Sequence, residues 1–528
     1  MTDTPCSTQP QPPAPAPAPV RAPSDQKHSY NQILKSSALV GGSSVLKIAI
    51  GVVRTKVMAV LLGPAGMGLM GTYSSISDLT QSVAGMGINS SGVRQIAEAA
   101  GSGEMERIGR TAAVLRRVSL LLGLLGALAL VVFCRPLARV SFGTNERASA
   151  VALLSIVVFL QTISAGQGAF IQGLRRISDL ARMGVLGVLY GTLISIPLVY
   201  CLGERGILPS LIGIAAMSIV TSWWYSRKVK VPVPSLSWIE VRREASDLLK
   251  LGFAFMASGF LMMGAGYVIR IMVLRKAGLD AAGLYQSAWN LGGVYVGFIL
   301  QAMGADFYPR LTAVCKDDAQ CNRLVNEQAQ ISLLLSGPGV IATMTFAPVV
   351  IALLYTAKFM AAVEVLRWFC LGLTLQVVAW PMGFIVVARN EQKIFIATEI
   401  AAVSVQVGLA WLFIDHFNKN AVGAGISFFG LYLWHTLLIY FIVRRLTGFR
   451  WSSANCKLLW IFLPLIGLSF GAFYVLPFGW ATAVGTLAAL LSGVYSLRSL
   501  AHLVALERIP RPVRRLLNGL RLLPKANP

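Results

Sequence analysis

The sequence predicts an all-α integral membrane protein with about fourteen transmembrane helices, arranged as two pseudo-symmetric six-helix lobes and a C-terminal helix pair. The 528 residues are 55% hydrophobic and only 13% charged, with a mean hydropathy of +0.66. Apolar runs of about 20 residues, which suit a bilayer, recur along nearly the whole chain. Short stretches in the two halves match at a nearly constant spacing. A soluble globular protein is therefore excluded.

Length and hydrophobicity place the predicted spans to within a few residues. They lie near residues 36–62, 71–98, 110–133, 149–173, 181–201, 206–226, 247–274, 281–306, 324–354, 361–387, 394–414, 422–445, 457–477 and 479–503. No loop between them is long enough to form a domain. Any function must therefore reside inside the helical bundle.

These spans divide the chain into six regions. In order, we expect a disordered Pro/Ala-rich cytoplasmic tail (1–34), an N-lobe of spans 1–6 (35–228), a cytoplasmic linker (229–246), a C-lobe of spans 7–12 (247–446), spans 13–14 (447–505) and a basic cytoplasmic tail (506–528). The N-terminal tail contains the run PQPPAPAPAPVRAP, which cannot bury apolar surface. It lacks the pattern of a signal peptide.

The charge distribution indicates orientation in a membrane. The formal net charge is +24, which in a soluble protein would suggest nucleic acid as a partner. Here the Lys and Arg residues gather in short segments between spans, which is the positive-inside pattern, and both termini are expected in the cytoplasm. The seven cysteines show no disulfide or metal-ligand spacing. No nucleic acid, metal or cofactor is predicted.

The two halves resemble each other. Residues 170–175 match 384–389, with Phe, Ile and Arg identical at corresponding positions, and Gly68-Leu69 matches Gly283-Leu284. The spacing corresponds to six helices, an even number, so the repeats cross the membrane in the same direction. Parallel six-helix repeats are a transporter architecture with the substrate site between them.

The first two spans, within 47–94 and joined by a Gly/Pro turn, carry charges that lipid would disfavour. Lys47 and Arg54 are seven residues apart and share one helical face. A Lys or Arg at the bilayer centre costs roughly 2.5–3.5 kcal/mol on insertion scales. This face is therefore expected to line a protein interior or a watery cavity.

The second helix of this hairpin presents a polar stripe. Its members are Ser74, Ser75, Asp78, Gln81, Ser82, Gly85 and Asn89. Arg54 and Asp78 lie at similar depth below the turn, so they could pair. Lys47 has no acidic residue at its level in the hairpin and is the better candidate for an anionic substrate.

Four stretches resemble a known family: residues 46–48, 56–69, 358–362 and 383–389. They are similar to the Wzx-type O-antigen translocases, and most closely to the branch that flips the enterobacterial common antigen lipid intermediate. The likeness covers roughly residues 35–446. That family belongs to the multidrug/oligosaccharidyl-lipid/polysaccharide exporter superfamily, in which two six-helix lobes form a V.

The resemblance implies a flippase for surface polysaccharide biosynthesis in the bacterial inner membrane. Its substrate would be an undecaprenyl-diphosphate-linked oligosaccharide, moved from the cytoplasmic to the periplasmic leaflet. A glycan polymerase and a chain-length regulator are the implied partners. The Pro-rich leader and the two added spans depart from the family, although related peptidoglycan-precursor flippases use an extra helix pair as a groove for the lipid tail.

For such a substrate, Lys47, Arg54 and Arg270 are predicted to hold the diphosphate. The alternative is that Arg54 is paired with Asp78 and that Arg270 extends to the membrane interface. Asn89, Trp289 and Asn290 are further predicted substrate-binding residues, the last two as candidates for contact with the sugars. Aromatic faces and amides suit sugar rings, but a membrane Trp also serves in packing or at the interface.

Acidic residues inside spans could couple transport to protons, because burial in a low dielectric favours the neutral carboxyl group. Asp78, Glu364 and Glu399 are the candidates. Glu364 could instead pair with Arg367, three residues later on the same helix. Near the cytoplasmic end of another span, Asp306 and Arg310 could form a structural pair or a gate.

No nucleotide-binding loop, dinucleotide fingerprint, metalloprotease motif or nucleophile elbow occurs in the sequence, so an enzyme is not predicted. Movement would be passive or driven by an ion gradient. Two alternatives stay open. One is a cation-coupled multidrug exporter of the same fold, whose substrates would prefer an acidic cavity. The other is a membrane glycan polymerase, which would normally carry a large periplasmic loop.

Overall fold

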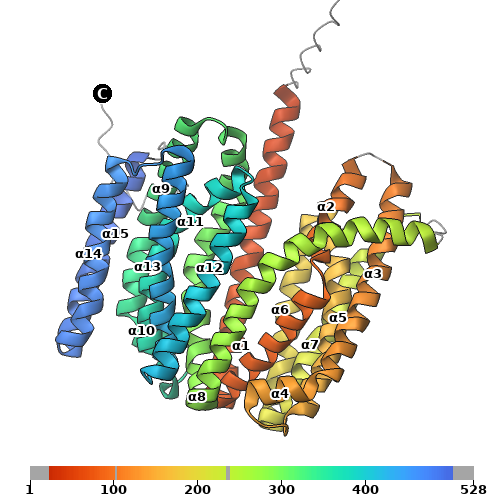
Figure 1. Ribbon diagram of the computed structural model, residues 1–528, viewed down its shortest axis with the longest axis horizontal. Helices are drawn as coiled ribbons and strands as arrows, with labels where there is room; N and C mark the ends of the chain where they lie inside the picture. The colour runs from red at the N-terminus through yellow and green to blue at the C-terminus, as the bar shows by residue number, and fades with distance from the viewer. Residues whose placement is uncertain (1–22, 102–103, 233–237, 504–528) are drawn as a thin grey trace, which may run out of the picture.

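The computed structural model describes residues 23–101, 104–232 and 238–503. Across these ranges the chain is helical, without β-strands. The helices form two bundles side by side, with α14 and α15 at the outer edge of the second bundle (Figure 1). This agrees with the predicted all-α fold.

In the described residues, the N-bundle is formed by seven α-helices that precede the linker. They are α1 (Pro23–Ala84), α2 (Ile88–Gly101), α3 (Met105–Val132), α4 (Cys134–Phe142), α5 (Ala148–Gly173), α6 (Ile177–Leu202) and α7 (Ile207–Arg227). The C-bundle follows. It comprises α8 (Trp238–Val314), α9 (Asp318–Thr345), α10 (Ala347–Leu354), α11 (Ala362–Ala388), α12 (Gln392–Trp411) and α13 (Asn420–Thr447). The last two helices, α14 (Ser453–Val475) and α15 (Phe478–Leu503), pack against α9.

Several helices can cross a membrane. Within the described ranges, eight segments are long and apolar enough, or nine if α9 and α10, bent by 74°, form one span. One of these segments, Ile177–Arg227, holds both α6 and α7, and α1 and α8 are not among them. The chain is thus a multi-pass membrane protein, while the count of fourteen spans stays a prediction.

The longest helices, α1 and α8, are each broken near the middle by one glycine. Gly63 has φ 64° and Gly278 has φ 83°, with ψ near 180° at both, a conformation that a side chain disfavours. Positive φ angles also occur at Arg175 and Asn390. In both pairs the residue numbers differ by 215, so the backbone irregularities recur at the spacing that the sequence matches predict.

The two broken helices meet through glycines that correspond in the repeat. A Cβ atom on Gly68 would lie 2.2 Å from the carbonyl oxygen of Leu279. A Cβ atom on Gly283 would lie 1.9 Å from the carbonyl oxygen of Pro64. Pro64 and Leu279 are themselves 215 residues apart, so the contact is reciprocal, as a pseudo-twofold axis requires. Only residues without a side chain allow this approach of the two bundles.

Two cations join the bundles near these breaks. Lys56 of α1 donates hydrogen bonds to the carbonyl oxygens of Ala352, at 2.8 Å, and Tyr355, where α10 ends. Arg275 of α8 donates to the carbonyl oxygens of Arg139 and Val140, at 2.9 and 3.1 Å, where α4 ends.

Each bundle thus sends one cation to the C-terminal carbonyls of a short helix in the other bundle. Such carbonyls lack intrahelical partners and carry partial negative charge. We call these contacts the Lys56 latch and the Arg275 latch. From sequence, the default expectation for Lys56 is extension to the membrane interface, and the structure instead gives it partners in the other bundle.

Replacing Lys56 and Arg275 together with Met is expected to separate the bundles at this end. Hydrogen bonds from charged donors contribute about 1.5–3 kcal/mol each, so the separated population should rise at least about tenfold. Spin labels at two exposed positions, Asn145 and Lys358, in a background without native cysteines, would report the change by electron paramagnetic resonance distances. Lys276→Met, beside Arg275 and exposed, is the control; identical distance distributions in all variants would contradict this role.

Three boundaries differ from those predicted. Helix α1 begins at Pro23 rather than near residue 35, because Pro23 is the last proline of the leader and proline is tolerated in a first turn. The second predicted span ends at Ala84, before a turn with positive φ at Met86 and Gly87. In the linker, α8 already begins at Trp238. Residues 1–22 and 504–528, which hold the first part of the predicted N-terminal tail and all of the predicted C-terminal tail, lie outside the described ranges, and the region boundaries stay predictions.

Candidate functional site

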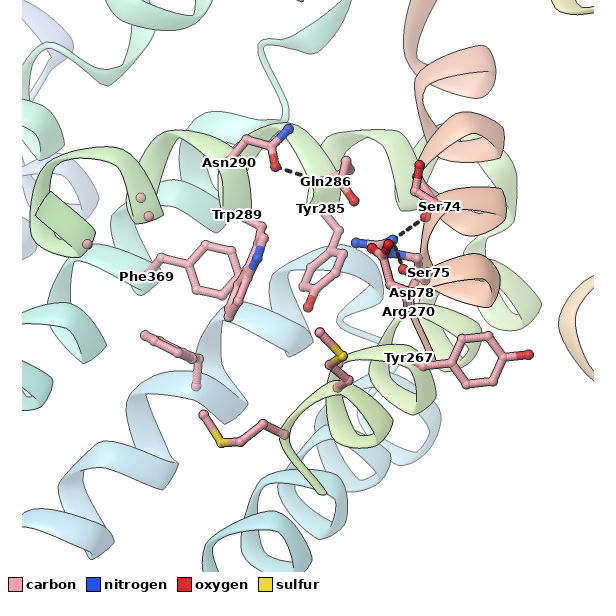
Figure 2. A pocket seen from close by; sticks show the side chains of 18 of the residues that line it. Ser74, Ser75, Asp78, Tyr267, Arg270, Tyr285, Gln286, Trp289, Asn290 and Phe369 are labelled. Carbon is pink, nitrogen blue, oxygen red and sulfur yellow. Dashed lines mark hydrogen bonds between the residues drawn. The ribbon is translucent and has the colours of Figure 1, made fainter. Parts of the chain in front are cut away.

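A cavity of about 1180 Å³ lies between the two bundles. The N-bundle contributes residues mainly from α1, with single residues from α6 and α7, and the C-bundle contributes residues from α8, α11, α12 and α13. Figure 2 shows the part of this cavity where α1 faces α8. Among the described side chains, five charged ones line it: Lys47, Arg54, Asp78, Arg270 and Glu399.

The two predicted cations of α1 lie along α6. Arg54 donates through Nε to Ser195 Oγ at 3.0 Å, and a Cβ atom on Gly191 would lie 3.1 Å from Arg54 Nη1. Lys47 approaches Gly184 in the same way: a Cβ atom on Gly184 would lie 3.4 Å from Lys47 Nζ. Gly184 and Gly191 are seven residues apart, as Lys47 and Arg54 are, so the glycine face of α6 accommodates both cations.

Lys47 is half-buried and lines the cavity without a hydrogen bond or ion pair to any residue in the described ranges. Arg54 has one hydroxyl partner, which leaves most of its five donors available. An anion in the cavity would therefore meet both cations. The predicted cationic face is present, and its role in binding stays a proposal.

The suggested pairing of Arg54 with Asp78 is wrong. Asp78 lies beside Arg270 of α8 (Figure 2), close enough for direct electrostatic interaction. Equal depth in the membrane did not decide the partner, because Arg54 projects toward α6 while Asp78 projects toward α8. The structure thus places Asp78 of α1 beside Arg270 of the other bundle.

Arg270 is only 8% exposed and does not extend to the membrane interface. Its Nη1 donates to the carbonyl oxygen of Gly71 on α1. It also donates to Ser75 Oγ on the same helix (Figure 2). Its guanidinium also lies 5.9 Å from the centre of the Tyr285 ring. Arg270 therefore joins α8 to α1 and is largely occupied by protein partners, so its predicted contact with a diphosphate is less favoured than that of Lys47.

A group of aromatic side chains forms part of the C-bundle wall of the cavity. Trp289 of α8 is 42% exposed and lines the cavity. The centre of its ring lies 6.3 Å from the ring centre of Tyr285, in a stacked arrangement. The ring centres of Phe369 and Phe428 lie 5.6 and 5.7 Å away, in edge-to-face arrangements. These neighbours fix the orientation of the indole, so its exposed surface is presented to the cavity. Figure 2 shows Trp289 between Phe369 and Tyr285.

Asn290, also predicted as a site residue, lines the cavity beside Trp289. Gln286 donates through Nε2 to Asn290 Oδ1 at 2.7 Å (Figure 2). The carbonyl oxygen of the Gln286 side chain is buried and has no partner among the described residues. The two amides are therefore held one helical turn apart on the cavity face of α8.

Three other predicted site residues, Asn89, Glu364 and Arg310, are not among the lining residues of this cavity. Asn89 is exposed near the start of α2, beyond the turn that ends α1. Glu364 begins α11 and accepts a long hydrogen bond from Tyr474 of α14 at 3.4 Å. Arg310 is exposed near the end of α8, and the side chain of Asp306 lies outside the described side chains. The predicted pair or gate of these two stays untested.

Arg367, the suggested partner of Glu364, lies over the ring of Phe473 at 3.5 Å and donates to the carbonyl oxygen of Met344 at 3.4 Å. No ion pair within 4.0 Å joins Glu364 and Arg367 in the described part of the chain. Their spacing on the helix was compatible with a pair, but α14 supplies nearer partners to both residues.

Sequence reasoning missed a second polar group on the C-bundle wall, which we call the α12 group. It comprises Gln376, Glu399, Gln406, Tyr432 and His435, from α11, α12 and α13. From the sequence, Glu399 was a coupling candidate, and His435 was expected to pack within its aromatic helix. The available signal was the spacing of Glu399 and Gln406, seven residues apart on one helical face. Among the described residues, no three His, Cys, Asp or Glu side chains gather to hold a metal ion.

The fold resembles solved membrane transporters. An inward-facing multidrug resistance MATE family transporter of the MOP superfamily aligns with TM-score 0.66 at 18% identity, covering 78% of this chain and 96% of that one. The lipid II flippase MurJ in an inward closed conformation aligns with TM-score 0.61 at 14% identity, covering 88% and 99%. This chain therefore has the fold of these solved membrane transporters, with a cavity between its two helical bundles.

The sequence also places the chain within a family. Residues 57–364 match the family described as polysaccharide biosynthesis protein, and the chain belongs to it. A lipid III flippase from Escherichia coli (strain K12) is 23% identical over 411 residues, covering 76% of this chain and 95% of that protein. A lipid III flippase from Shigella flexneri matches to the same extent. The resemblance noted from short motifs is thereby confirmed.

Proposed function

We propose that this protein is a flippase that moves undecaprenyl-diphosphate-linked oligosaccharide units from the cytoplasmic to the periplasmic leaflet of the bacterial inner membrane. One observation carries the proposal. Lys47 and Arg54 of the N-bundle face a cavity between the bundles, whose C-bundle wall carries aromatic and amide side chains. The likeness to lipid III flippases and to the fold of a lipid II flippase supports the same reading.

The chemistry of the cavity suits a lipid-linked head group. A diphosphate needs cationic donors when it leaves water, because an unpaired charge in a low dielectric is very costly. Lys47 and Arg54 supply them, and Trp289 with Asn290 offers surfaces suited to sugar rings. The polyprenyl tail can remain in the bilayer. The cavity therefore serves the polar head group alone.

Movement would follow from alternating access of the two bundles. The contact of Gly68 with Gly283 and the Lys56 and Arg275 latches join the bundles near the breaks in α1 and α8. Opening there requires these contacts to separate, and the head group would then be released on the other face. The protein would act without chemical conversion of its substrate. A glycan polymerase and a chain-length regulator are the proposed partners.

A cation-coupled multidrug exporter is the second candidate. The likeness to a MATE transporter and the presence of Asp78 and Glu399 in the cavity favour it. Against it, Asp78 already lies beside Arg270, and Lys47 would repel a cationic drug in the cavity. A lipid-linked anion fits the remaining charges better.

A deletion strain distinguishes these candidates. Loss of the protein is expected to cause undecaprenyl-diphosphate-linked oligosaccharide to accumulate on the cytoplasmic side and the corresponding surface polymer to disappear. Mass spectrometry of extracted lipids would also identify the sugar. Normal lipid intermediates together with raised sensitivity to cationic dyes would instead support the drug exporter. Complementation by the intact chain is the control.

A further inference from the structure

We propose that the two bundles divide the head group between them: the N-bundle holds the diphosphate, and the α12 group of the C-bundle forms a separate subsite for the sugars. This inference rests on the proposed function and adds to it the residues that recognise the glycan. Glu399 and Gln406 of α12 and Gln376 of α11 are its polar centre. Glu399 then acts in substrate recognition rather than in ion coupling.

One face of α12 lines the cavity and presents two polar side chains to it. Glu399, Ala402, Val403 and Gln406 all line the cavity, which is the spacing of one continuous helical face. Small side chains between the two polar ones leave room above the helix for a bulky ligand. The remaining members of the α12 group, on the neighbouring helices α11 and α13, border the same space.

Several polar atoms on this wall lack partners. Glu399 is half-buried and makes no hydrogen bond or ion pair with a residue in the described ranges. His435 Nδ1 is buried without a partner there. Native proteins normally satisfy such groups, since each unpaired one costs roughly 1–3 kcal/mol. A ligand rich in hydroxyl and amide groups, as an oligosaccharide is, would satisfy both acceptors and donors.

The sign of the charges sets the orientation of the head group. A diphosphate beside Glu399 would meet a like charge, whereas Lys47 and Arg54 on the opposite bundle attract it. A carboxylate accepts hydrogen bonds only, which suits sugar hydroxyl groups. Trp289 lies in the C-bundle wall of the same cavity and offers a flat apolar surface. The glycan is thus expected against the C-bundle.

Binding to two ligands tests this division. The purified full-length chain would be titrated with undecaprenyl diphosphate and with the same lipid carrying a disaccharide of N-acetylhexosamines, and binding measured by native mass spectrometry. The wild type is expected to bind the disaccharide ligand at least about tenfold more tightly. Glu399→Ala and Gln406→Ala should each reduce that preference to about threefold or less, with affinity for undecaprenyl diphosphate within about twofold of wild type.

Two further variants make the outcome decisive. Lys47→Ala should weaken binding of both ligands by the same factor, because both carry the diphosphate. Glu391→Ala, at the start of α12 and not among the cavity-lining residues, should behave as wild type. An unchanged preference in Glu399→Ala and Gln406→Ala, or equal weakening of both ligands, overturns the division while leaving the proposed function intact. If the wild type binds neither ligand, the proposed function fails as well.

Discussion

Replacement of Gly283 with Ala is expected to disrupt the junction of the two bundles and to abolish transport. The added Cβ atom would lie 1.9 Å from a backbone oxygen of α1, and backbone cannot move aside as a flexible side chain can. Overpacking of this kind costs about 1–3 kcal/mol and occasionally more. The purified variant should therefore melt several degrees below wild type, or survive with the bundles separated at this end.

Two measurements distinguish these results from a general effect of the substitution. Thermal unfolding in detergent reports the loss of stability, and the Asn145 and Lys358 label pair reports separation of the bundles. Gly264→Ala on the same helix, where an added Cβ meets nothing within 4 Å, is the matched control. It should retain or slightly raise stability, because Ala favours helix over Gly by about 1 kcal/mol. If Gly283→Ala had the melting temperature, label distances and transport of the wild type, the close contact would be contradicted.

Replacement of Lys47 with Ala is expected to lower flipping by about tenfold to a hundredfold. Lys47 lines the cavity without a protein partner, so its ammonium group is available to the diphosphate. A hydrogen bond to a charged group is worth about 1.5–3 kcal/mol, which gives that range. Lys47→Arg should retain most activity, and Lys47→Glu should lose nearly all of it. Restoration of surface polymer in the deletion strain would measure the effect.

Protein levels must be matched by immunoblot, because a charge inside the membrane also affects insertion. Lys276→Ala, an exposed Lys on α8, is the control for loss of one positive charge. Arg54→Ala should follow Lys47→Ala in direction, and it should also remove the hydrogen bond that Ser195 Oγ accepts from Arg54. Normal flipping by Lys47→Ala at wild-type levels would remove Lys47 from the site.

Helical periodicity was sufficient to predict the fold and the position of the cationic face. The apolar runs predict the helices, and the matched segments predict a repeat whose signature appears at Gly63 and Gly278. The seven-residue spacing of Lys47 and Arg54 predicts that they share a helical face, and both do line the cavity. These features depend on local sequence alone, which is why they could be read directly.

Partners between helices could not be predicted in the same way. Residue counting gives depth in the membrane, but the partner of a side chain depends on how each helix is rotated and which helix packs beside it. Asp78 therefore meets Arg270 rather than Arg54. The same limit applies to Lys56, whose carbonyl partners are almost 300 residues away in the chain. The α12 group likewise assembles only when three helices come together.

The most direct test of the central proposal is transport by the purified protein in liposomes. Vesicles would contain undecaprenyl diphosphate linked to a fluorescent oligosaccharide, and an added membrane-impermeant quencher would report the fraction exposed outside. The proposal predicts rapid equilibration between leaflets with the wild type and slow equilibration with Lys47→Ala. Equal rates in protein-free vesicles and in vesicles containing the wild type would contradict it.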